Sequence, residues 1–263
     1  MEKLTEADYF SMEAELFYTG STQIKNFLKC ENETLAKING CWIEEKSDAL
    51  LESSYIDEYF SGTLENFKLE HPEMFTQKGE LYAKYKKLDD IITQAENDNM
   101  FMKYINGKHQ VIMTGEIAGV PVKIKIDSFH ENKCIVDLKA IKDLKLIWNE
   151  ETREKQNFID YYDYVLQGAL YQEIVRQNTG KKLPFVIAVL TKEKISERAL
   201  LNIPQELLNE KLAFLENYLP HVKKLKEGKI EPTECGKCDY YKSQAKVSKV
   251  LDYKDYFDMR GGI

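Results

Sequence analysis

The spacing of hydrophobic residues changes along the chain, and the first region that it sets apart is residues 1–105. Apolar side chains recur there at intervals of three and four residues, as they do on the buried face of a helix. We therefore expect a helical N-terminal part. The pattern predicts helices over residues 21–29, with Ser21 as the N-cap, over 43–60, over 79–96, and over a shorter stretch that ends near Ile105.

Alternation of apolar and polar residues, which is typical of strands, begins after residue 106. Three segments show it: KHQVIMTGEI (108–117), VPVKIKIDSF (120–129) and KCIVDLKA (133–140). Turn-forming residues separate them, at Ala118-Gly119 and at 131–133. The pattern predicts an antiparallel meander of three strands.

A helix over 155–178 is predicted next, and Thr179-Gly180 ends it. A continuous apolar strand (184–191), an edge strand (195–203) and an amphipathic helix (205–226) follow. This order favours an α/β fold: a central mixed sheet that contains the antiparallel meander and is flanked by helices. We expect a single domain, 1–263, with a helical part (1–105), a core (106–230) and a polar tail (231–263).

Composition narrows the class of protein. The 263 residues are 43% hydrophobic, which suits a globular chain, and no run approaches the roughly 18–20 apolar residues of a membrane span. The first residues lack the pattern of a signal peptide, so we expect a cytoplasmic protein with no membrane partner. The net charge of −7 argues against tight DNA binding without a metal.

Two aspartates and a lysine occupy polar positions of the predicted meander. Asp127 ends the polar face of the second strand, and Asp137 and Lys139 share a face of the third. A hairpin with a three-residue turn places Asp127 opposite Asp137, an inference that a slip of one residue in register would undo. Adjacent carboxylates repel unless a cation lies between them, and oxygen ligands favour Mg²⁺ or Mn²⁺.

Such a cation polarises a phosphodiester and makes water more acidic, so this group of residues is a candidate hydrolytic site. Lys139 is placed to position the attacking water or to stabilise charge in the transition state. Asp-x-Lys is a common tripeptide, however, and the alternative is that these charges form the solvated face of a two-layer sheet.

Gln167 and Tyr171 lie four residues apart in the predicted helix 155–178, so they share one face of it. Glutamine can bond a water, a backbone group or a phosphate, and tyrosine can stack or bond. From the residues alone, a helix face that packs on the sheet, with Tyr171 in the core, is the alternative interpretation.

Taken together, GVPVKIKID, IVDLKA and QGALY resemble the PD-(D/E)xK nuclease superfamily, in its RecB/RecE-like branch of phage-type exodeoxyribonucleases. The resemblance covers about residues 20–245. It implies a restriction-endonuclease-like core in which Asp127 and Asp137 are the two acids of the motif and Lys139 is its lysine. Gln167 and Tyr171 match the Gln-x-x-x-Tyr motif of the branch.

This resemblance implies a metal-dependent exonuclease that uses Mg²⁺ or Mn²⁺ and digests DNA at duplex ends. It also implies a role in phage-type recombination, a single-strand annealing protein as partner, and a homo-oligomer. Two alternatives are a catalytically silent nuclease fold that binds DNA or a protein, and an unrelated α/β protein whose two aspartates do not meet in space.

Further candidate residues extend the site. Members of this branch add a metal ligand from an early helix, and Asp57 takes that place here, with Glu58 as its neighbour; both also fit the surface of an acidic helix. Glu116 in the first strand is a candidate outer ligand or base beside Asp127. The lysines expected to contact phosphate are Lys123, Lys125, Lys142 and Lys145.

The five cysteines fit no secreted disulfide framework. Cys41 and Cys134 are expected to be small buried side chains. Cys235 and Cys238 form a Cys-x-x-Cys pair, and Cys30 matches the early cysteine of related nucleases that hold an iron–sulfur cluster. Three thiols are too few for a four-cysteine cluster, so we expect free thiols. A zinc site would need a fourth ligand, such as His221 or Asp239.

Overall fold

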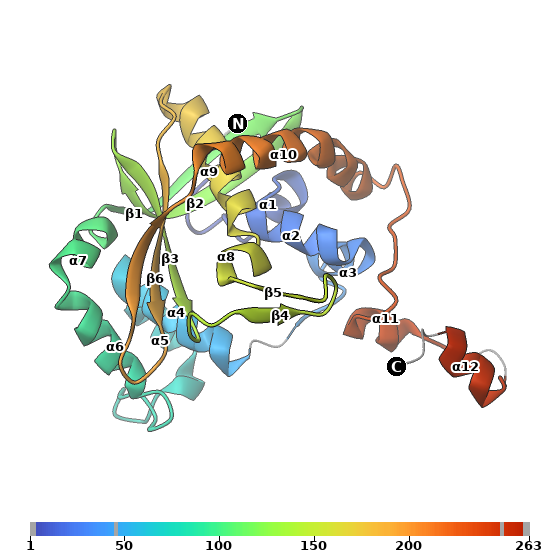
Figure 1. The fold of residues 1–263 in the computed structure, drawn as a ribbon, viewed down its shortest axis with the longest axis horizontal. Coiled ribbons are helices and arrows are strands. Elements are labelled where there is room, and N and C mark those ends of the chain that lie inside the picture. Colours follow the sequence, from blue (N-terminus) through green and yellow to red (C-terminus); the bar gives the residue numbers. More distant parts are fainter. Residues whose placement is uncertain (1–3, 45–46, 248–249, 260–263) are drawn as a thin grey trace.

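A mixed five-stranded sheet organises the computed structural model, which describes residues 4–44, 47–247 and 250–259. The strand order is β1-β2-β3-β6-β7, and β3 pairs with β6 in parallel while the other neighbours are antiparallel. Figure 1 shows helices on both sides of this sheet. The strands are β1 (Lys108–Ile117), β2 (Val120–His130), β3 (Cys134–Ile141), β6 (Phe185–Thr191) and β7 (Arg198–Asn202).

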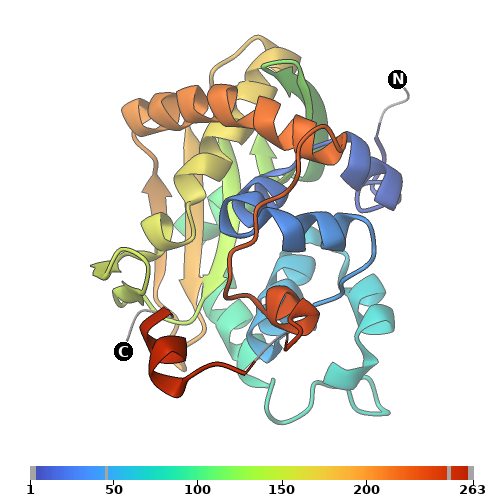
Figure 2. The same cartoon turned by 90° about the vertical axis from the view of Figure 1, so that its right-hand side faces the viewer.

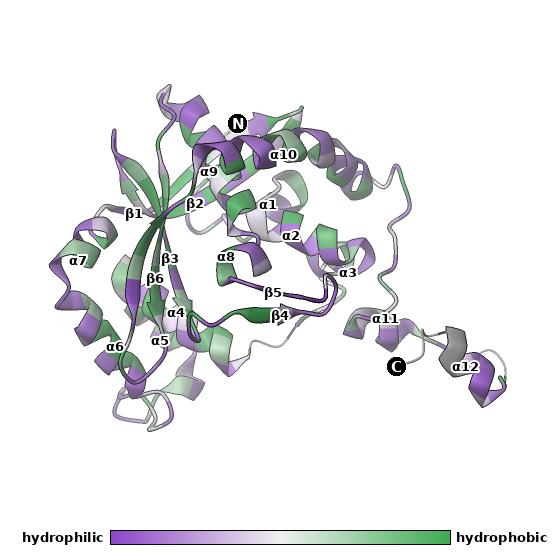
Figure 3. Ribbon diagram, in the orientation of Figure 1, coloured by the Kyte–Doolittle hydropathy of each residue, from purple (hydrophilic) through white to green (hydrophobic). Residues whose placement is uncertain are grey.

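The two faces of the sheet carry separate hydrophobic clusters. On one face, side chains of β3 and β6 pack against α4 (Asp48–Ser61), α6 (Lys87–Glu96) and α7 (Asn99–Ile105). On the other face, the sheet packs against α2 (Ser21–Lys29), α9 (Tyr164–Thr179) and α10 (Gln205–Lys226). Because both faces are covered, β6 is buried at every position, and it is coloured as a hydrophobic strand in Figure 3.

Shorter elements surround these layers. Figure 2 shows the orange helix α10 across one end of the sheet and the chain running from it to the red C-terminal helices, which lie apart from the sheet in Figure 1. The remaining elements are α1 (Met12–Phe17), α3 (Glu31–Ile38), α5 (Leu64–Glu70), the 3-10 turn η1 (Pro72–Met74), β4 (Ile147–Asn149), β5 (Glu154–Gln156), α8 (Phe158–Tyr161), α11 (Asp239–Gln244) and α12 (Tyr253–Met259).

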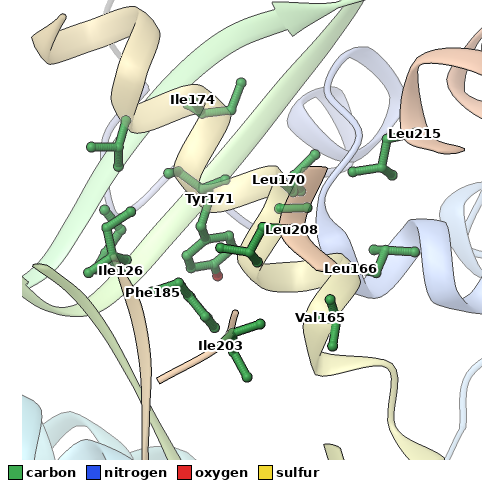
Figure 4. Packing of buried hydrophobic residues seen from close by; sticks show 14 of the residues in the cluster. Ile126, Val165, Leu166, Leu170, Tyr171, Ile174, Phe185, Ile203, Leu208 and Leu215 are labelled. Atoms are coloured by element: carbon green, nitrogen blue, oxygen red, sulfur yellow. The ribbon is translucent and has the colours of Figure 1, made fainter. Parts of the chain in front are cut away.

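Helix α9 approaches the sheet closely at Gly168. A Cβ added there would lie 2.6 Å from Cδ1 of Phe185 in β6 and 3.0 Å from Cδ2 of Leu208 in α10. Figure 4 shows Phe185 and Leu208 beside Tyr171 in the layer of apolar side chains between α9 and its neighbours. Glycine at this position therefore sets how near the helix, and the side chain of Gln167 before it, comes to β3.

The predicted meander, the strands β6 and β7 and the helix α10 are confirmed, and Gly180 ends α9 in the left-handed conformation expected of a helix C-cap. Three helix predictions were too long. The helix expected over 43–60 begins only at Asp48. Residues 79–86 form turns, and α6 begins only at Lys87; the predicted helix 155–178 is divided into β5, α8 and α9. Leu81 pairs with Phe75 in an isolated bridge, a tertiary contact that helical spacing alone does not reveal.

Smaller corrections concern single residues. The N-cap of α2 is Gly20, and Ser21 is its first helical residue. Cys41 is exposed, whereas Cys134 is buried as expected.

No helix in the described parts of the chain is both long and apolar enough to cross a membrane.

Candidate active site

Asp127 lies where β2 and β3 separate. The backbone pairing of these strands ends at Ser128 with Val136, and one further step in the same register brings Asp127 opposite Asp137. At this point a side-chain hydrogen bond takes the place of the backbone hydrogen bonds between β2 and β3. Oδ2 of Asp127 accepts a hydrogen bond from the amide of Leu138 at 2.9 Å. The hairpin register deduced from the turn length is therefore the one observed.

We call the point where β2 and β3 separate, at Asp127 and Asp137, the fork. Asp137 is its most buried charged side chain, with an exposed fraction of 1%. Its Oδ1 accepts a hydrogen bond of 2.6 Å from Nε2 of Gln167, and its Oδ2 lies 2.5 Å from Nζ of Lys139. The ammonium of Lys139 also lies 5.0 Å from the ring centroid of Tyr164, a cation–π distance. One carboxylate thus joins β3 to α9 and holds the lysine in place.

A third carboxylate reaches the fork from helix α4. Asp57 lines the same pocket as Asp127, between α4 and the ends of the strands. Its Oδ1 is buried and has no hydrogen-bond partner among the described residues. Glu58, the neighbouring candidate, is bonded instead to Thr63. Of the two acidic residues proposed on this helix, the structure brings only Asp57 to the site.

Burial and mutual repulsion perturb the protonation of these groups. Burial, followed by the charge of Asp137, raises the pKa of Asp127 to about 7. Burial and the charges of Asp127 and Asp137 raise the pKa of Asp57 well above its usual value. For Lys139, burial acts to lower the pKa, but Asp137 and Asp127 raise it above its ordinary range. The site therefore contains three carboxyl groups, of Asp57, Asp127 and Asp137, around the protonated ammonium of Lys139.

Tyr171 has a structural role in this arrangement. Its hydroxyl donates a hydrogen bond of 2.9 Å to the carbonyl of Lys125, two residues before Asp127. Its ring is buried and meets that of Phe185 edge to face. The interpretation that places Tyr171 in the core fits these contacts, and Gln167 is the member of the pair that touches an acid of the site.

Glu116 does not join the site. It is exposed, it lies opposite Pro121 near the β1–β2 turn, and its backbone is bonded to Gln177 of α9. The register places Ser128 opposite His109, so Glu116 is separated from Asp127 by about six residues of strand, roughly 20 Å. The antiparallel register, which the alternation pattern does not fix, excludes it as a ligand.

Lys123 is also unavailable. Its side chain is 2% exposed, and its Nζ donates to Glu15 at 2.7 Å and to the carbonyl of Tyr9. It is a buried ion-pair partner of the N-terminal segment, so the expectation that it contacts phosphate is wrong for this conformation.

The other three lysines keep some access to solvent. Lys125 is largely buried and lies 3.3 Å from a carboxylate oxygen of Glu6. Lys142 and Lys145 are exposed in the loop that follows β3, beyond Lys139. Of the four lysines, these last two present unburied charge near the fork, and they stay candidates for phosphate contact.

Two residues near the site were missed from the sequence. Lys25 of α2 lies over the ring of Tyr164 at 5.0 Å and donates to the carbonyl of Tyr162. Burial, followed by repulsion from Lys139, lowers its pKa to about 8. Nothing in STQIKNFLK distinguishes Lys25 from Lys29, whereas Tyr164, three residues before Gln167, shares a helix face with it and could have been found by that spacing.

The donor atoms suit a hard cation. Asp57, Asp127 and Asp137 offer carboxylate oxygens, and the unpartnered Oδ1 of Asp57 is a buried acceptor that a cation would satisfy. Among the described residues, however, no three acidic side chains bring one oxygen each within 4.8 Å of one another, whereas the sulfur atoms of Cys30, Cys235 and Cys238 lie that close together. Binding of one cation by all three aspartates therefore needs their side chains to move closer together.

Comparison with known proteins gives a matching family and similar solved structures, one of which is described here. Residues 20–244 match the model of a PDDEXK-like domain of unknown function (DUF3799). The crystal structure of a protein named "Putative exonuclease" from Eubacterium rectale is 41% identical in sequence, covers 100% of both chains and superimposes with a TM-score of 0.92. No curated protein matches the chain.

Proposed function

This chain belongs to the family of PDDEXK-like domains that its match defines, and we propose that it is a metal-dependent nuclease that hydrolyses phosphodiester bonds of DNA. One observation carries the proposal: at the fork of β2 and β3, Asp127 and Asp137 lie side by side, and Asp137 holds the ammonium of Lys139. The name of the structural neighbour from Eubacterium rectale, "Putative exonuclease", agrees with this activity.

In this proposal Asp127 and Asp137 hold a divalent cation, and Asp57 completes the set of ligands from α4. Oxygen donors favour Mg²⁺ or Mn²⁺ over softer ions. When bound, the cation supplies Lewis-acid chemistry to the phosphodiester and neutralises the carboxylates. The carboxylates must be ionised for this, so the raised pKa values of Asp57 and Asp127 make the affinity for metal increase with pH.

Lys139 stabilises the negative charge that develops on the phosphoryl oxygens in the transition state. Its raised pKa keeps it protonated near neutral pH, which suits an electrostatic role better than proton transfer. Gln167 fixes Asp137 from the side of α9, and Tyr171 fixes the backbone of β2 before Asp127. Both are positioning residues.

Lys25 is proposed to contact the phosphate backbone beside the scissile bond. Its ammonium lies over the ring of Tyr164 and donates a long hydrogen bond of 3.3 Å to the carbonyl of Tyr162. Both contacts are weak, so the ammonium can turn toward an anion. Lys142 and Lys145 extend this contact along the loop after β3.

The finer role rests on the resemblance of the motifs. We propose that the substrate is a duplex end, that the enzyme acts as an exonuclease in phage-type recombination, and that a single-strand annealing protein is its partner. A homo-oligomer that encircles DNA would make digestion processive.

Digestion of linear and closed-circular duplex DNA, each with Mg²⁺ or Mn²⁺, tests the proposal. We expect linear DNA to be degraded, circles to survive, and EDTA or Lys139→Ala to abolish the activity. Lys133→Ala is the matched control, since Lys133 is an exposed lysine of the same hairpin. Degradation of circles would support a nuclease but reject the exonuclease proposal.

A folded wild-type protein that is as inert as Lys139→Ala with every metal would overturn the nuclease proposal. It would favour a nuclease fold that binds DNA or a protein without cutting, and a gel-shift measurement with the same DNA would identify which.

A further inference from the structure

Three cysteines far apart in the sequence converge outside the carboxylate site. Cys30 lies between α2 and α3, and Cys235 and Cys238 lie in the segment that leads into α11. Their sulfur atoms all lie within 4.8 Å of one another. Cys30 is buried and the other two are partly exposed, so the group opens toward solvent on one side.

The separation of the sulfurs fits a shared metal ion. Sγ of Cys238 lies 3.8 Å from Sγ of Cys30. Thiolates that bind Zn²⁺ at about 2.3 Å with tetrahedral angles are about 3.8 Å apart, whereas the sulfurs of a disulfide are about 2.05 Å apart. The three residues are free cysteines at the spacing of metal ligands.

The turn between the two late cysteines directs backbone donors at sulfur. The amide of Cys238 donates to Sγ of Cys235, and the amide of Tyr241 donates to Sγ of Cys238, each at 3.3 Å. Gly236 has a φ of 73°, in the left-handed region that glycine adopts without strain. Hydrogen bonds from amides stabilise negative charge on sulfur, so this turn is suited to thiolates.

We propose that Cys30, Cys235 and Cys238 bind one soft divalent cation of the Zn²⁺ class, with its fourth position taken by water or a small external ligand. Thiolate donors select such an ion over Mg²⁺ or Mn²⁺. Neither side chain considered for the fourth ligand is free, because His221 is bonded to Glu31 and Asp239 to Lys242. A cluster of four iron and four sulfur atoms held by four cysteines does not fit this donor set.

The cation would attach the C-terminal segment to the body of the protein. Helix α11 has no buried residue, and its segment is otherwise joined to the N-terminal helices by polar and aromatic contacts, such as the hydrogen bond from the Thr233 amide to Glu31 and the ring of Tyr240 against Trp42. A bond from Cys30 to both late cysteines supplies the stabilisation that a small apolar contact area does not.

Metal content and Co²⁺ spectra of the full chain test the proposal. After dialysis against a weak chelator, we expect about one zinc per chain, falling to none in Cys235→Ser. Replacement by Co²⁺ should give the intense near-ultraviolet band of thiolate-to-metal charge transfer, which oxygen ligands at the aspartates cannot produce. Cys41→Ser, which changes an exposed cysteine outside the group, should keep both the zinc and the band.

Limited proteolysis separates a structural role from loose binding. We expect removal of zinc, or Cys235→Ser, to expose the segment after residue 229 to cleavage while the core remains intact. Wild-type protein without retained metal, a disulfide between Cys30 and Cys238 detected by mass spectrometry, or bound iron with inorganic sulfide would each overturn the proposal. None of these results depends on nuclease activity.

Discussion

The carboxylate site and the cysteine site differ in how closely their donor atoms are assembled before any metal binds. The sulfur atoms of the three thiols already lie within 4.8 Å of one another, whereas no three acidic side chains among the described residues bring one oxygen each that close together. A thiol that keeps its proton is neutral, and backbone amides offset the charge of one that loses it, so the three sulfurs can be packed together at little cost. Carboxylates are charged and repel, so the fold holds them near one another but apart.

Under the two proposals, this difference implies different uses for the metal at each site. A preassembled thiolate site favours a permanently bound ion that stabilises structure. A strained acidic site favours an ion that enters with the substrate, because the phosphate and the cation neutralise each other as they bind. Substitutions at each site should therefore have separate effects.

The largest effect is expected from Asp137→Asn. Loss of this carboxylate removes a proposed metal ligand and the partner of Lys139, and a loss of about 4 kcal/mol of transition-state stabilisation corresponds to a roughly 10³-fold lower kcat/KM. Zinc content should not change, because the cysteine site is separate. Asp90→Asn, at an exposed position of α6, is the control. Loss of zinc in Asp137→Asn would show that the two sites are not independent.

The pH dependence of stability tests the repulsion itself. The pKa of Asp127 is raised from an ordinary value of 3.8 to about 7, so between these pH values the unfolded chain is ionised while the folded protein retains the proton. The free energy of unfolding of the metal-free protein should therefore fall as the pH rises from about 4 to about 7, by up to about 4 kcal/mol. Above that range this contribution is constant.

Thermal or urea unfolding in EDTA measures this trend, and Asp127→Asn should flatten it. Added Mg²⁺ should restore stability at pH 8 more than at pH 5, since the cation needs ionised ligands. A metal-free protein whose stability rises over the same range would contradict the account of a repulsive site.

Gly168→Ala tests how far the carboxylate site depends on tertiary packing. The added methyl group meets Phe185 and Leu208, so α9 must shift, and overpacking of this kind costs about 1–3 kcal/mol. Because Gln167 moves with the helix, kcat should fall as well. Gly20→Ala is the control: its φ is −101° and its nearest contact for a Cβ is an ordinary 3.7 Å. Equal stability of both variants would show that the space between α9, Phe185 and Leu208 can accept a methyl group without strain.

Lys25→Ala has the smallest expected effect, and it tests the region between the two sites, since Lys25 and Cys30 are separated by little more than one helical turn. Loss of one phosphate contact should raise KM about tenfold, or about 1.4 kcal/mol, with little change in kcat. Lys29 is an exposed lysine of the same helix, so Lys29→Ala should leave KM unchanged. The steepness of the salt dependence of binding should also decrease in Lys25→Ala.

The features that were predicted correctly from the sequence depend on residues that are close together in the chain. Asp127 and Asp137 are joined by a short hairpin, and alternation together with turn residues is enough to place them in register. The same reasoning placed β6 and α10, because long periodic segments carry their own signal.

What failed depended on contacts between distant segments. Burial of Lys123 follows from its pairing with Glu15, which lies more than a hundred residues earlier in the chain. Glu116 was misplaced because alternation shows which face a residue takes but not how far along the strand its partner lies. Lys25 approaches the site only through the packing of α2 against α9, which no local pattern encodes.

The parallel pairing of β3 with β6 has a consequence for folding kinetics. The β2–β3 hairpin closes over a turn of three residues, whereas β6 can join β3 only after residues 142–184 have formed their crossover. Closing the longer loop costs more chain entropy, so we expect the hairpin to form first. Pulse-labelled hydrogen exchange would then show early protection in β2 and late protection in β6. The two aspartates would then meet with only Lys139 of the same hairpin to offset their charges, before Gln167 of α9 is in place, and divalent ions in the refolding buffer should therefore speed the early phase.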